Sequence, residues 1–178
     1  MQQVQQRLEP QEEQKYPPIV SMVRKNKRTP IPINAQLQIL GKDYPDGEVK
    51  SRSLRHLVWE TDIIPSPNSA KYRIRINYTI GQRPNVYVID PPMLKRSEGE
   101  KFLPHVFSTE KQQICLHYGP FGEWDDSMFL ARKNVPWASE WLLFYELWVI
   151  TGKWLGEGVE HSGKVPNAEQ DQPEVNKE

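Results

Sequence analysis

The side chain best suited to chemistry in this chain of 178 residues is its single cysteine, Cys115. A thiolate is a strong nucleophile, and a nearby imidazolium or hydrogen-bond donor favours the thiolate over the thiol. Four polar side chains of suitable type lie within about a dozen positions of it, namely His105, His117, Asp125 and Asp126. Cys115 is therefore either a reactive nucleophile or a buried thiol in a short strand, because free cysteine is among the most buried residue types.

Other chemistry at this cysteine is less well supported by the spacing. A lone cysteine cannot form a disulfide within the chain, and Cys115 with His117 does not match a recognised zinc-ligand spacing, since His56 and His161 are distant in the sequence. A papain-like peptidase would pair Cys115 with His105 or His161, but the local cysteine motif of that family is missing. We therefore expect neither a metal nor a cofactor.

Charge and composition argue against several broad classes of protein. Lys and Arg total 23, as do Asp and Glu, so the formal net charge is zero and bulk attraction to nucleic acid is not expected. The chain has no apolar run of about 18 residues, and its first residues do not resemble a secretory signal. We expect a cytoplasmic protein that binds neither nucleic acid nor membrane. The basic run over 24–28 is interpreted as a solvated helix face rather than a docking site for an acidic partner.

One folded domain is predicted over residues 17–161. Residues 1–16 are rich in glutamine and charge, and are expected to form a flexible arm. Residues 162–178 contain almost no large apolar side chain, so they are expected to form a disordered tail.

Strands are predicted over 56–65, 71–80 and 85–90, with a weaker one over 33–41. Turn-rich segments separate the first three, and short links favour antiparallel neighbours, so we expect a meander. The alternation is nearly strict in 71–80, which predicts one buried face with Tyr72, Ile74, Ile76 and Tyr78 and a second face with Arg73, Arg75 and Asn77.

Helices are predicted over 19–28, 125–134 and 136–151. Asp125 or Asp126 would cap the second, and the third would begin near Pro136 and end before Gly152. Large apolar residues recur every three or four positions in this third helix, which predicts that they are core: Trp137, Trp141, Leu142, Phe144, Tyr145, Leu147 and Trp148. Trp124 and Trp154 lie outside this stripe and could shape a groove. The segment 93–113 is expected to be irregular. Together these elements predict an α+β fold with helices against one antiparallel sheet.

The order of these elements around the cysteine resembles that of ubiquitin-conjugating enzymes. In that family a His-Pro-Asn motif places its histidine ten residues before the catalytic cysteine, as His105 stands before Cys115 here. The family's Ile-Cys-Leu triplet is matched by residues 114–116, and its following tryptophan by Trp124. Val106 and Phe107 stand where the family has Pro and Asn, so the role linked to that Asn in oxyanion stabilisation or loop support is vacant or moved, and backbone amides could substitute for it.

The last part of the predicted domain resembles, more specifically, the stand-alone ubiquitin-conjugating-like proteins of bacterial type II CBASS antiphage systems. The resemblance covers about residues 34–161. It rests on the pairs and triplets Pro136-Trp137, Glu140-Trp141-Leu142, Tyr145-Glu146 and Thr151-Gly152, and on Trp148, Trp154, Gly156 and His161.

The resemblance implies a fold, a reaction and a partner. The fold is that of ubiquitin-conjugating enzymes, an antiparallel meander flanked by helices. Cys115 would accept, as a thioester, the C-terminus of the operon's cGAS-like nucleotidyltransferase (CD-NTase), to prime or regulate that cyclase. His105 would stand with Cys115 among the catalytic residues and would brace the loop before Cys115, with its ring hydrogen-bonded to the backbone. His117, Asp125, Asp126 and His161 would play supporting roles. The chain is too short to contain an activating domain, so either a separate activating enzyme or an already strained C-terminus of the cyclase is also implied. Two alternatives remain open: a cysteine peptidase or deconjugase acting on the cyclase tail, and a non-catalytic binding module.

Overall fold

The computed structural model describes residues 28–116 and 124–156. Residues 19–27 of the helix predicted over 19–28 lie outside these residues, and so do the arm over 1–16, the tail over 162–178, His117 and His161; Arg28 is described and is not helical.

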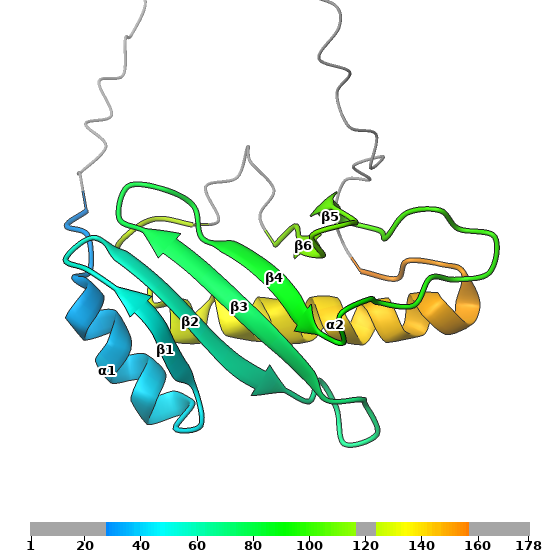
Figure 1. Cartoon of the computed structure of the whole chain (residues 1–178), viewed down its shortest axis with the longest axis horizontal. Helices are drawn as coiled ribbons and strands as arrows, with labels where there is room; N and C mark the ends of the chain where they lie inside the picture. Colours follow the sequence, from blue (N-terminus) through cyan, green and yellow to red (C-terminus); the bar gives the residue numbers. More distant parts are fainter. Residues whose placement is uncertain (1–27, 117–123, 157–178) are drawn as a thin grey trace, which may run out of the picture.

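A six-stranded antiparallel sheet forms the centre of the fold (Figure 1), in the order β1-β2-β3-β4-β6-β5. The strands β2, β3 and β4 confirm the predicted meander, and β1 extends it at one edge. The prediction that 93–113 is wholly irregular is wrong, because a short hairpin of β5 and β6 extends the sheet at the other edge. The bounds are β1 Glu48–Arg52, β2 His56–Ile63, β3 Tyr72–Thr79, β4 Asn85–Asp90, β5 Val106–Ser108 and β6 Gln113–Ile114.

The two faces of the sheet differ as the alternation in β3 predicts. Its four apolar side chains are buried, and Arg73, Arg75 and Asn77 are only half-buried. On the polar face Glu60 of β2 is almost fully buried beneath these arginines, at 3.2 Å from Arg73 Nε and 2.7 Å from Arg75 Nη2. The polar face is therefore held by ion pairs and the other face by apolar packing.

The segment predicted as a weak strand over 33–41 is instead a helix, α1, Ile33–Asp43. Its buried residues are Ile33, Gln36 and Leu40, whose spacing of three and four is that of one helix face. The Gln36 side chain accepts a hydrogen bond from the Leu130 N–H at 2.9 Å and donates one to the Met128 carbonyl at 2.8 Å. These bonds attach α1 to the segment that precedes the long helix.

The long helix α2, Asn134–Thr151, confirms the prediction over 136–151 with two more residues at its start. Pro136 lies in its first turn, and Gly152 ends it in the left-handed conformation with φ of 70°. The short helix predicted over 125–134 is wrong: a turn closed by Asp125 leads into a single 3₁₀ turn, η2 Leu130–Arg132, before α2 begins. The Asp125 carboxylate accepts the Ser127 N–H, which favours a turn rather than a helix start.

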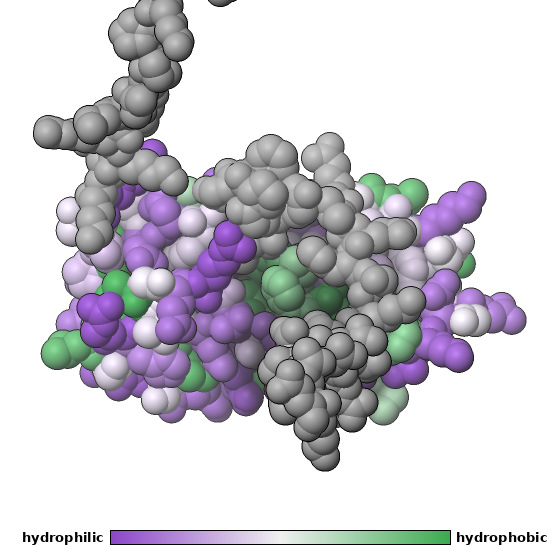
Figure 2. Space-filling view, turned by 90° about the horizontal axis from the view of Figure 1, so that it is seen from above, coloured by the Kyte–Doolittle hydropathy of each residue, from purple (hydrophilic) through white to green (hydrophobic). Residues whose placement is uncertain are grey.

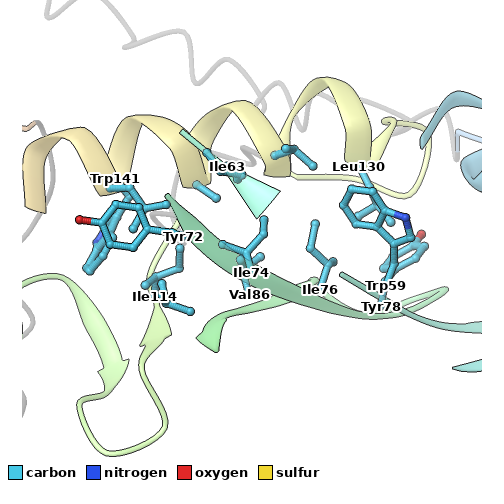
Figure 3. Packing of buried hydrophobic residues seen from close by; sticks show 14 of the residues in the cluster. Trp59, Ile63, Tyr72, Ile74, Ile76, Tyr78, Val86, Ile114, Leu130 and Trp141 are labelled. Atoms are coloured by element: carbon cyan, nitrogen blue, oxygen red, sulfur yellow. The ribbon is translucent and has the colours of Figure 1, made fainter. Parts of the chain in front are cut away.

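Apolar side chains from the sheet and from α2 meet in one core (Figure 3). Trp59 and Leu130 lie at one end of it, and Ile114 and Trp141 lie at the other, beside Tyr72. In Figure 1, α2 runs along one face of the sheet toward the β5–β6 hairpin. The core thus fixes β6 against the middle of α2, and the cysteine follows β6 directly. Within the described residues, no helix combines the length and apolarity required to cross a bilayer.

Candidate active site

Cys115 is held where the last short strand meets the long helix. It follows Ile114, the buried end of β6, and is itself half-buried. Its N–H donates to the carbonyl of His105 at 2.9 Å, across the mouth of the β5–β6 hairpin. The main chain at the thiol is therefore fixed by a residue ten positions earlier.

His105 is the residue that joins this loop to α2. Its carbonyl accepts a second hydrogen bond from Trp141 Nε1 at 3.1 Å, so one oxygen holds both Cys115 and the helix. The residue is 7 % exposed, and its ring stacks on Trp154 with centroids 4.7 Å apart and planes at 27°. The main-chain carbonyl of His105 therefore holds the backbone of Cys115, while its ring packs against the segment after α2.

The backbone of His105 has a positive φ of 49°, which only a few per cent of non-glycine residues adopt. Gln112, at the other end of the hairpin, has the same φ. The Gln112 side chain is buried and donates to the Val88 and Pro91 carbonyls at 2.7 and 3.0 Å, and it accepts the Leu94 N–H. The hairpin that carries the thiol is therefore anchored to β4 and to the loop after it.

A pocket of about 550 Å³ opens beside the thiol. Its lining combines polar and apolar surface and comes from the end of β6, one face of α2 and the segment after α2. The lining residues are Cys115, Leu116, Trp137, Glu140, Trp141, Phe144 and Leu155. Figure 2, seen from the side of the β5–β6 hairpin, shows recessed apolar surface near the middle of this face.

Aromatic rings behind this pocket pack on one another. Trp154 lies 5.7 Å from Trp141 and 5.9 Å from Phe144, centroid to centroid, and Trp141 stacks on Tyr145 at 5.6 Å. Trp154 thus packs against two residues of the pocket lining, Trp141 and Phe144, and its predicted part in shaping a groove stays a prediction. Trp124 packs instead against Tyr78, edge to face at 5.6 Å.

Glu140 is the functional candidate that the sequence analysis missed. It is exposed and lines the pocket one turn from Trp137 and Phe144. No hydrogen bond or ion pair to its carboxylate is found among the described residues. The helical spacing could have indicated Glu140, because positions 137, 140, 141 and 144 share one face of any helix. The sequence does not indicate that Cys115 lies next to this face.

Asp125 and Asp126 make hydrogen bonds and an ion pair with residues outside the Cys115 pocket. Asp126 accepts the Tyr78 hydroxyl at 3.0 Å and the Gly81 N–H at 2.8 Å, and burial followed by this bond raises the pKa of Tyr78 above its usual range. Hydrogen bonding from Ser127 is the main cause that lowers the pKa of Asp125, which also pairs with Arg28 at 2.9 Å. These contacts tie the segment before α2 to β3 and to the start of the described chain.

The two residues at the positions of the family's Pro and Asn lie on β5. Val106 is buried and pairs with Ile114 of β6, whereas Phe107 is exposed. Val106 thus supports the strand that leads into the thiol. No group of three or more metal-ligating side chains is found in the described part of the chain.

The arrangement can hold a thiol at the edge of a pocket lined by aromatic and aliphatic side chains and one carboxylate, with the backbone of the thiol fixed. A covalent adduct on the sulfur would have room beside it. Comparison with known families gives one match: the family described as type II CBASS E2 protein matches residues 36–162, which include the strand before Cys115 and all of α2. No curated protein matches the chain.

Proposed function

The chain belongs to the family of type II CBASS E2 proteins, and from that premise we propose that Cys115 is its acyl-accepting thiol. Membership itself gives a role in the CBASS antiphage system and an activity of the conjugating type. The finer proposal is that Cys115 forms a thioester with the C-terminus of the cognate cGAS-like nucleotidyltransferase. This thioester would prime or regulate the cyclase.

The observation that carries the proposal is the placement of Cys115 at a pocket rather than in the core. The residue before it, Ile114, is 2 % exposed, whereas Cys115 is half-buried and contributes to the pocket lining. Its N–H bond to His105 holds the backbone, so the side chain can react without unfolding of the hairpin. A thiol placed for packing alone would lie on the same face as Ile114.

The reaction needs an activated carboxyl group, because a free carboxylate does not acylate a thiol. A separate activating enzyme that adenylates the cyclase C-terminus would supply it. The Cys115 thiolate attacks the carbonyl carbon, the C–S bond forms, and AMP leaves with the electron pair of the broken C–O bond. An incoming amine then forms the amide and releases the thiol.

His105 is a positioning residue in this proposal, since its carbonyl orients the main chain of Cys115 and its ring packs on Trp154. Asp125 and Asp126 act through the fold, as their bonds to Arg28, Tyr78 and Gly81 indicate. Roles for His117 and His161 remain predictions.

Intact-mass analysis of the chain co-expressed with its operon tests the proposal. The wild type should carry an adduct whose mass equals the two chains less one water, and the adduct should be lost on treatment with thiol or hydroxylamine. The Cys115→Ser variant should give a hydroxylamine-sensitive ester that resists thiol, and Cys115→Ala should give none while still binding the cyclase, because one small side chain contributes little to a standard interface.

Other outcomes would contradict the proposal. A cyclase shortened at its C-terminus only when Cys115 is present would identify a peptidase. A stable complex with no covalent mass, in the presence of ATP and the complete operon, would identify a binding module.

A further inference from the structure

The charge and polarity of the side chains that line the pocket beside Cys115 influence which acyl donors can bind there. Among the described lining residues, five side chains are apolar or aromatic, and the charged one is Glu140. An acidic group entering this space would meet the Glu140 carboxylate, whereas a basic group would find that carboxylate and several aromatic faces.

The covalent geometry of a thioester decides which part of a donor lies here. The acyl carbon is bonded to the Cys115 sulfur, and three residues of an extended chain span only about 10 Å. The last residues of the donor must therefore lie against the walls that Cys115 shares, namely α2 and Leu155. An acceptor amine is not tied to the sulfur in this way, so the donor tail is the occupant that the geometry favours.

We propose that this pocket reads the side chains that immediately precede the acylated residue of the donor, and that it selects a basic, long-stemmed side chain over an acidic one. The proposal rests on the proposed thioester function and adds its substrate class. The stem of an arginine would contact Trp137 and Phe144, and its guanidinium would reach Glu140. Lys133, the residue before α2, gives a precedent, because its Nζ lies 5.4 Å from the centroid of the Trp137 ring.

Synthetic peptide thioesters test the proposal without an activating enzyme, because they can exchange directly onto a protein thiol. Four peptides should end in Arg-Arg-Gly, Leu-Leu-Gly, Gly-Gly-Gly and Glu-Glu-Gly, each as the same small-molecule thioester. The common terminal glycine keeps the intrinsic reactivity of the acyl carbon equal. Successive side chains of an extended tail point to opposite sides, so doubling the residue places one copy toward the pocket.

The measurement is the rate at which Cys115 gains each acyl mass. We expect the Arg-Arg peptide to load fastest and the Glu-Glu peptide slowest, with a ratio of about five to ten at low salt that falls at high salt. Glu140→Gln should reduce this ratio by about two- to fivefold, the effect of one solvent-exposed ion pair. Because any change in the thiol itself scales all four rates together, the ratio reports the pocket alone.

Two further variants complete the design. Glu100→Gln removes the same charge from an exposed loop position outside the pocket lining and should leave the Arg-to-Glu ratio at its wild-type value. Leu155→Ala removes an apolar wall at a side chain that is 59 % exposed, so folding should persist while the preference for Leu-Leu over Gly-Gly decreases.

The outcomes separate the two proposals. Equal loading of all four peptides onto Cys115, or a ratio that Glu140→Gln does not change, would overturn the pocket proposal and leave the thioester function standing. No loading of any peptide, under conditions in which free cysteine reacts, would overturn the thioester function itself.

Discussion

Replacing His105 with alanine should lower the free energy of unfolding by about 2 kcal/mol. Loss of the stacked pair with Trp154 accounts for about 0.5–1.5 kcal/mol. Loss of the remaining contacts of the ring, in a residue that is 7 % exposed, adds about 1 kcal/mol. Alanine keeps the cost of the positive φ of 49°, so no backbone strain is relieved.

Urea denaturation measures this change as a lower midpoint with an unchanged slope. His105→Asn is the matched variant, because asparagine also lacks the ring but tolerates a positive φ several-fold better, which should recover about 1 kcal/mol. The carbonyl that binds the Cys115 N–H is main chain and persists in both variants, so alkylation of native Cys115 should change little. An unchanged urea midpoint in His105→Ala would refute the argument that the packing of the ring stabilises the fold. A large loss of acyl transfer in a variant whose stability is little changed would show that the ring takes part in the chemistry.

Three further predictions concern α1, the polar sheet face and the thiol. Gln36→Leu should lower the free energy of unfolding by about 2–4 kcal/mol in urea denaturation, because it leaves a part-buried carbonyl and a buried N–H before α2 without these partners. Burial raises the pKa of the Glu60 carboxyl, but hydrogen bonds from Arg75 and Arg73 of β3 outweigh this effect and hold that pKa below 4.5. The corresponding stability is present above about pH 4.5 and is lost as the pH falls through the lower native value, so Glu60→Gln should flatten the decline of unfolding free energy in acid. Iodoacetamide should label Cys115 in the native protein at a rate approaching that of a small free thiol, and labelling only after unfolding would contradict its placement at a pocket.

Much of the fold was predictable because its strands bury one face. Alternation over 71–80 located both faces of β3, and the aromatic stripe with Gly152 located α2 within two residues of its start. The helix α1 was mistaken for a strand because it is short and its inward face includes a glutamine. Gln36 is buried for its hydrogen bonds across the fold, and no property of the local sequence reveals such distant partners.

The short strands were missed for a related reason. β6 has two residues and β5 has three, which is too few for a period of two to be recognised. Their pairing depends on the buried Gln112 and on main-chain bonds, including that between Cys115 and His105. The spacing of ten residues in the sequence indicated that Cys115 and His105 are related. It could not indicate that the His105 carbonyl accepts a hydrogen bond from the Cys115 N–H.

Trp141 shows why core and site cannot be separated in this protein. Its ring is 4 % exposed and stacks on Tyr145, so the sequence correctly assigns it to the core. The same ring lines the pocket beside Cys115, and its Nε1 holds the His105 carbonyl that also holds the thiol backbone. A substitution there would lower stability and displace the thiol together. A loss of acyl transfer in such a variant therefore says nothing about direct contact with the donor, whereas the exposed wall residues Glu140 and Leu155 can report the pocket without disturbing the core.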